Sequence, residues 1–136
     1  MIAIINYGLG NLHSVKKAVA FVGVEAVVTD DSQEILSAKK VILPGVGAFA
    51  DGMAGLESRS LVTVVREVAA SGKPILGICL GMQLLFEESR EQGQHSGLGL
   101  LRGSVVPFTG SEIKIPQIGW NQLDICASSN LLDGVK

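Results

Sequence analysis

Short aliphatic runs alternate along the N-terminal part of the chain with segments whose apolar residues recur at helical spacing. Runs of this length, bounded by Gly, Pro or polar residues, are typical of buried strands in a parallel sheet. The predicted strands span residues 2–6, 25–29, 39–43 and 74–78. Helical spacing predicts helices at residues 12–22, 61–70 and 81–91, and a short one beginning at 30–32.

This alternation predicts an α/β fold with a mostly parallel sheet and right-handed crossovers. The pattern changes after residue 93, and beyond residue 100 the short runs at 103–108 and 123–126 predict antiparallel additions. We expect a single domain over residues 1–136, with ligands bound beyond the carboxyl ends of the parallel strands. Three loops leave those ends, at residues 7–11, 44–49 and 79–83.

Composition removes several classes of function. Eleven basic and thirteen acidic residues give a net charge of −2, so no basic excess is available to neutralise a nucleic-acid backbone. No apolar stretch reaches the about 18 residues of a membrane-spanning helix. Residues 1–6 have no basic region and are too short for the apolar core of a signal peptide, so we expect none. Cys79 and Cys126 offer neither a disulfide framework nor metal-ligand spacing, and we expect Cys126 to be a packing residue. The sequence predicts a cytoplasmic protein without metal or cofactor.

The most informative motif is Gly-x-Cys-x-Gly at residues 77–81, between a predicted strand and a predicted helix. In this setting it has the form of a nucleophile elbow, a strained turn that exposes its central side chain above the sheet. Amides at the start of the helix favour the reactive thiolate. We expect Cys79 to be a nucleophile and the Leu80 N–H to stabilise a developing oxyanion. A cysteine packed at a strand end is the alternative.

The Pro-Gly-Val-Gly turn at residues 44–47 ends a neighbouring parallel strand and should lie beside the elbow. Its backbone N–H groups can form the second half of an oxyanion hole, although a plain turn from strand to helix is an equal alternative. It is not a phosphate loop, because no Gly-Lys-Ser/Thr follows. The glycines of 7–11 do not fit a dinucleotide fingerprint, since His13 stands where the third glycine would be.

A cysteine nucleophile needs a general base, usually histidine. The chain has two histidines, His13 early in the first predicted helix and His95 in a glycine-containing loop. Neither has a neighbouring pattern that would orient it, so we expect neither to be the base. The residues thus predict a nucleophile without an evident base.

At these residues the chain resembles the triad-type class I glutamine amidotransferases, and among them the glutaminase subunits of imidazole glycerol phosphate synthases. The resemblance covers nearly the whole chain and implies a three-layer, flavodoxin-like fold. The elbow is typical of the whole superfamily. The first and last matching stretches restrict the resemblance to the glutaminase subunits. The matching stretches are residues 6–12, 43–49, 77–86, 97–100 and 115–121.

The resemblance implies a role for each matching position. Cys79 would attack the carboxamide of glutamine, forming a γ-glutamyl thioester and releasing ammonia. Gln83, Glu91 and the backbone at Gly47 would hold the amino-acid end of the substrate. The amides of Val46 and Leu80 would form the oxyanion hole.

The resemblance also implies a partner. Ammonia would pass to a (β/α)8-barrel cyclase subunit in a heterodimer, which would make imidazole glycerol phosphate and an aminoimidazole carboxamide ribotide for histidine biosynthesis. Asn11, Ser14 and Trp120 would lie toward that subunit.

Two departures from the family pattern alter these expectations. The family's catalytic His and Glu belong to a Phe-His-Pro-Glu-like motif that this sequence lacks. We therefore expect the chain to be the N-terminal two-thirds of a glutaminase subunit and to show no turnover alone. Gln117 stands where the family usually has His, and because it cannot carry a positive charge we expect no ionic contact there.

Three other functions stay open. The chain could be the glutaminase of a different pathway, or a non-catalytic docking module because the base is missing. A cysteine hydrolase of the deglycase type often has His directly after the elbow cysteine, and Leu80 at that place disfavours it.

Overall fold

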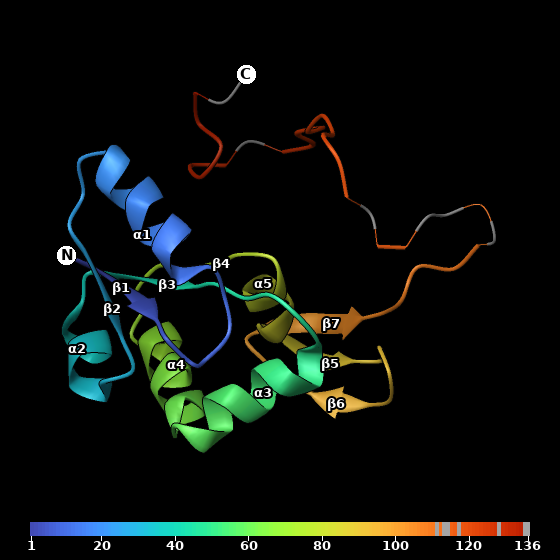
Figure 1. Cartoon of the computed structure of the whole chain (residues 1–136), viewed down its shortest axis with the longest axis horizontal. Helices are drawn as coiled ribbons and strands as arrows, with labels where there is room; N and C mark the ends of the chain where they lie inside the picture. The colour runs from blue at the N-terminus through green and yellow to red at the C-terminus, as the bar shows by residue number, and fades with distance from the viewer. Residues whose placement is uncertain (111, 113–114, 117, 128, 135–136) are drawn as a thin grey trace.

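The computed structural model describes residues 1–110, 112, 115–116, 118–127 and 129–134 (Figure 1). Strands and helices alternate as far as α5, and strands follow. The strands are β1 (Ile2–Ile5), β2 (Ala26–Thr29), β3 (Lys40–Leu43), β4 (Ile75–Gly77), β5 (Phe86–Ser89), β6 (His95–Ser96) and β7 (Leu101–Val105). The helices are α1 (Leu12–Phe21), α2 (Ser32–Ser37), α3 (Phe49–Ser58), α4 (Leu61–Ala70) and α5 (Leu80–Leu84).

In the described part of the chain the first strands form a parallel sheet in the order β2-β1-β3-β4. Ile4 pairs with Ile42, and Leu43 pairs with Gly77, so β1, β3 and β4 end at the same edge of the sheet. The predicted α/β fold with a parallel sheet is confirmed.

Helices cover both faces of this sheet, which gives three layers (Figure 1). Successive strand residues point to opposite faces. Ile5 and Leu43 therefore lie in the larger core with α2, α3, α4 and α5, whereas Ile4 and Ile42 pack with Val19 of α1. Part of the α1 face is open: an apolar groove there is lined by Ser14, Val15, Ala18, Val19, Val22, Ile42, Leu76 and Ile78.

Local sequence explains where the predicted helices begin and which face they bury. The Asn11 side chain accepts from the Ser14 amide at 3.2 Å and caps α1. Helix α4 covers the predicted residues 61–70, and its buried side chains recur at helical spacing: Leu61, Val64, Val65 and Val68.

The predicted helix over residues 81–91 is wrong. Helix α5 ends at Leu84, and β5 begins at Phe86. The Leu84 carbonyl accepts from the Leu98 amide at 2.9 Å, and the Leu85 carbonyl accepts from the Leu101 amide at 2.9 Å. These carbonyls are therefore bonded to a later segment of the chain instead of to the next helical turn.

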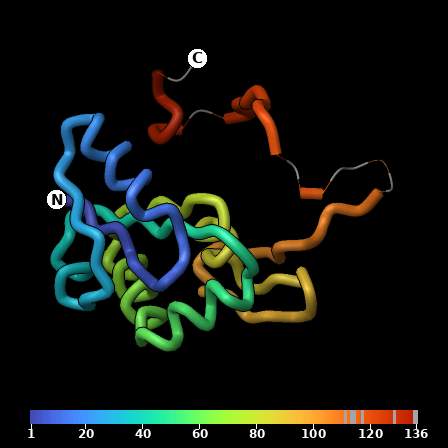
Figure 2. The backbone as a smooth tube through the Cα atoms, viewed as in Figure 1, coloured from blue at the N-terminus to red at the C-terminus, as the bar shows by residue number. Residues whose placement is uncertain are grey.

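The predicted antiparallel additions after residue 100 are also corrected. Strand β7 does follow residue 100, but it pairs parallel to β5, and the antiparallel partner of β5 is β6, before residue 100. The run at 123–126 contains no strand, and the described residues of 118–134 extend away from the body of the fold (Figure 2). The loop predicted at 44–49 is followed by α3, which the sequence pattern did not show because Gly52 and Gly55 lie within it.

Candidate active site

Cys79 occupies a strained turn between β4 and α5. Its backbone lies at φ 54° and ψ −118°, a region that non-glycine residues rarely adopt, and its side chain is exposed. A Cβ on Gly77 would lie 2.5 Å from the Met82 Cα, and one on Gly81 would overlap the Leu43 carbonyl oxygen. Both flanking positions therefore require glycine, and the predicted elbow is present.

The Pro-Gly-Val-Gly turn lies against this elbow, as its position after β3 predicted. A Cβ on Gly45 would lie 2.7 Å from the Gly81 nitrogen and 2.8 Å from the Leu80 Cβ. The Ile78 amide donates to the Leu43 carbonyl at 3.0 Å and fixes the two loops at their base. As the first residue of α5, Leu80 has an N–H without an acceptor inside the helix. Val46 is 51% exposed.

Tyr7 also belongs to this region, although no sequence motif predicts a role for its side chain. The ring is fully buried after β1, and its hydroxyl donates to the Pro44 carbonyl oxygen at 2.6 Å. Burial raises the pKa of Tyr7 to about 12, and the nearby Cys79 adds to the shift. Tyr7 is therefore a neutral hydrogen-bond donor at physiological pH and cannot be the missing base.

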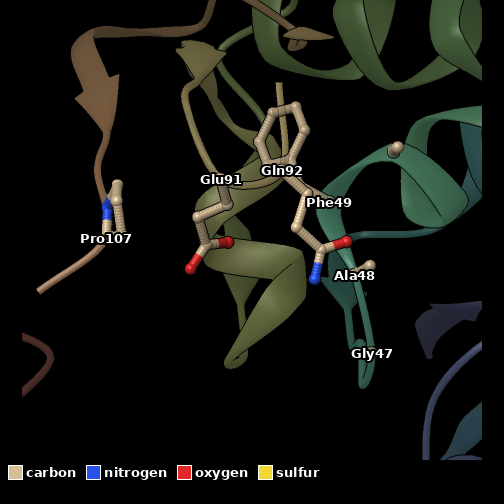
Figure 3. A pocket seen from close by; sticks show the side chains of 7 residues that line it. Gly47, Ala48, Phe49, Glu91, Gln92 and Pro107 are labelled. Atoms are coloured by element: carbon tan, nitrogen blue, oxygen red, sulfur yellow. The ribbon is translucent and has the colours of Figure 1, made fainter. Parts of the chain in front are cut away.

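A cavity of about 350 Å³ lies beyond the turn, within the range of about 300–1,000 Å³ typical of small-molecule sites. Its lining joins Gly47 and Glu91, which come from loops far apart in the sequence (Figure 3). Cys79 and the half-buried Gln83 lie outside this lining. The full lining is Gly47, Ala48, Phe49, Ala50, Glu91, Gln92 and Pro107.

The loop after β5 presents two polar side chains to this cavity. Figure 3 shows Glu91 and Gln92 extending between the Pro107 segment and the Gly47 loop. The buried Ser89 holds the loop, because its hydroxyl accepts from the Glu91 amide at 3.2 Å. Gln92 has φ 53°, a left-handed conformation. No sequence motif marks Gln92, which directly follows the predicted helix at 81–91.

Neither histidine is oriented as a base for Cys79. His13 is exposed on α1, and the His95 Nε2 lies 3.3 Å from the Gln92 carbonyl oxygen at the β5–β6 turn. In the portion of the chain that the structure describes, no group of three or more His, Cys, Asp or Glu side chains is placed to bind a metal ion. Over the same residues, no helix has the length and apolar character needed to cross a membrane.

Of the residues predicted to face a partner, Asn11 and Ser14 lie together at the start of α1. Asn11 caps α1, and Ser14 is exposed beside the apolar groove. Trp120 is fully exposed in the segment after β7. Gln117, for which we expect no ionic contact, lies outside the described residues.

An elbow cysteine beside a glycine turn on a parallel sheet is the arrangement expected for a glutamine amidotransferase, and the sequence comparison identifies the same class. Residues 3–131 match the class-I glutamine amidotransferases, and the chain belongs to that family. It is 53% identical over 126 residues to the imidazole glycerol phosphate synthase subunit HisH of Lactiplantibacillus plantarum, an alignment that covers 92% of this chain and 61% of the relative.

Other HisH subunits are similarly close. Identity to that of Geobacillus thermodenitrificans is 49% over 141 residues, covering 100% of this chain and 66% of the relative. Identity to the HisH subunit of Aquifex aeolicus is 52% over 134 residues, covering 98% of this chain and 64% of the relative. The chain thus spans roughly three-fifths of the length of these relatives.

A solved structure supports the fold. A crystal structure described as a glutamine amidotransferase superposes with a TM-score of 0.67 at 21% identity, covering 78% of this chain and 56% of the other. This neighbour confirms the predicted flavodoxin-like class I fold.

The pKa of Tyr7 gives a direct test of the buried contact. Tyr7 is the single tyrosine of the 136 residues, so phenolate absorbance reports on it alone. We expect its pKa to be about 12 in the folded chain and about 10 in denaturant. Because the folded chain binds this proton more tightly, the free energy of unfolding should be unaffected below pH 10 and fall as the pH rises toward 12. A folded chain whose phenol titrates near pH 10 would contradict the burial and the hydrogen bond.

Proposed function

We propose that residues 1–136 are part of a single glutamine amidotransferase domain, the glutaminase subunit of an imidazole glycerol phosphate synthase. The reaction is hydrolysis of glutamine to glutamate and ammonia. The observation that carries the proposal is the exposed Cys79 in a left-handed turn, packed against the Gly45 backbone. The identity of about half the residues to HisH subunits supports the choice within the family.

The reaction on this site begins at the Cys79 sulfur. The thiolate attacks the carboxamide carbon of glutamine, and the carbonyl oxygen takes the negative charge. The amides of Val46 and Leu80 donate to that oxygen. The C–N bond then breaks, ammonia leaves with the proton of the thiol, and a γ-glutamyl thioester remains on Cys79. Water adds to the thioester and releases glutamate and the thiol.

The substrate's amino-acid end occupies the cavity beside the turn. The Glu91 carboxylate accepts from the α-ammonium group, and the backbone at Gly47 holds the same end of the substrate. The presence of both residues in the cavity lining supports these roles. Gln83, half-buried on α5, contacts the same end of the substrate. This arrangement leaves the carboxamide directed toward the elbow.

The ammonia passes to a (β/α)8-barrel cyclase subunit in a heterodimer, with Asn11, Ser14 and Trp120 toward that partner. The exposure of all three side chains supports this orientation. Amide hydrolysis by a thiol needs no cofactor. The free thiols of Cys79 and Cys126 support a reducing compartment, the cytoplasm.

A non-catalytic docking module is the second candidate. The positions of the two histidines favour it, because neither is placed to act as a base for Cys79. His95 interacts at the β5–β6 turn, and His13 lies on α1. If the chain is a glutaminase, its general base therefore comes from outside residues 1–136.

Replacing the nucleophile separates these two functions. In the complete subunit with its cyclase partner, we expect Cys79→Ala to lower ammonia release from glutamine by at least about 10⁴-fold, since loss of a nucleophile removes the covalent route. Cys126→Ala is the matched control and should leave the rate unchanged, because Cys126 is exposed in the segment after β7 and is not the packing residue that the sequence predicted. Ammonia release that survives Cys79→Ala would exclude the proposed mechanism.

The role of Glu91 is tested by removing its charge. We expect Glu91→Gln to raise the KM for glutamine about tenfold with little change in kcat, because it weakens a charge-assisted contact made before and during the reaction. Glu67→Gln, an exposed residue of α4, should change neither parameter. An unchanged KM in Glu91→Gln would remove Glu91 from the substrate site.

A further inference from the structure

Tyr7 lies where three loops of the proposed site meet. It follows β1, Pro44 follows β3, and Cys79 follows β4, and these strands are neighbours in the sheet. A phenylalanine ring would fill the same space in the core. The hydroxyl is the one part of Tyr7 that packing does not explain, and it is buried and bonded to the Pro44 carbonyl.

Contacts to the Tyr7 backbone fix this residue in addition to the packing of its ring. The Arg59 Nη1 donates to the Tyr7 carbonyl oxygen at 3.1 Å. A Cβ on Gly55 of α3 would lie 2.5 Å from that same oxygen, so α3 packs directly on the Tyr7 backbone. The hydroxyl therefore extends toward the turn from a fixed base.

The turn packs closely against both this hydroxyl and the elbow. A Cβ on Gly45 would overlap the Tyr7 hydroxyl and would also crowd Gly81 and Leu80. Because the peptide unit is planar, bonding the Pro44 carbonyl fixes the orientation of the Pro44–Gly45 peptide that leads to Val46. The Tyr7 hydroxyl thus bonds the turn at the point where the turn meets the elbow.

We propose that Tyr7 is a positioning residue whose hydroxyl, by donating to the Pro44 carbonyl, holds the 44–47 turn at the distance from Cys79 and Leu80 that the oxyanion requires. This inference rests on the proposed glutaminase function. Tyr7 contacts neither the substrate nor the reacting atoms and acts through the backbone of the turn.

The test uses the complete subunit with its cyclase partner and the variant Tyr7→Phe, which keeps the ring and removes the hydroxyl. We expect the amides of residues 45–49 to exchange hydrogen about fivefold faster, the factor produced by losing one typical net hydrogen bond. We expect kcat for glutamine hydrolysis to fall about tenfold, less than the about 10²–10³ lost when an oxyanion donor is removed outright. The KM for glutamine should change less than about twofold, since ground-state binding is retained.

Thr29→Val is the matched control. Thr29 is buried at the end of β2, and its hydroxyl accepts from the Asp31 amide at 2.9 Å, away from the turn. It loses a comparable hydrogen bond, so its stability should fall while kcat and exchange at 45–49 stay unchanged. A merely structural role for Tyr7 would give the two variants the same kinetics.

Unchanged exchange at 45–49 in Tyr7→Phe would overturn the inference. Faster exchange with an unchanged kcat, in a complex whose wild type hydrolyses glutamine, would also overturn it. A wild-type complex without glutamine turnover would refute the proposed function instead, and the exchange result would then decide by itself whether the hydroxyl holds the turn.

Discussion

The close approach of β3 and β4 at their carboxyl ends is the constraint on which the site depends. Leu43 pairs with Gly77, and the backbone of Gly81 comes so near the Leu43 carbonyl that no side chain fits between them. This approach places the turn after β3 against the turn that carries Cys79. The strained backbone of Cys79 is maintained because the surrounding strands and α5 leave it no relaxed alternative. The geometry of the elbow is therefore a consequence of strand pairing.

Much of this arrangement could be predicted from the sequence because it depends on local patterns. Aliphatic runs and helical spacing placed β1 to β4, α1 and α4, and parallel connectivity then put the loops after β1, β3 and β4 at one edge. Glycines at 77 and 81 identified the elbow because a Cβ at either position would clash with the neighbouring backbone.

The remainder depends on contacts between distant segments, which no local pattern encodes. Residues 81–91 have helical spacing, but the carbonyls of Leu84 and Leu85 bond to the segment at 98–101, and the chain becomes β5. The same segment leads into β7, which then pairs with β5. Tyr7 was overlooked because an aromatic residue after a strand resembles core, and its hydroxyl finds its acceptor 37 residues away.

Covalent labelling by an electrophilic glutamine analogue tests the central claim most directly. The complete subunit is treated with the analogue in complex with the proposed cyclase partner, and peptide mass mapping locates the adduct, with excess glutamine as competitor. The structure predicts one adduct, on Cys79 and suppressed by glutamine, with Cys126 unmodified. An adduct on Cys126 with Cys79 spared would contradict the assignment of the nucleophile.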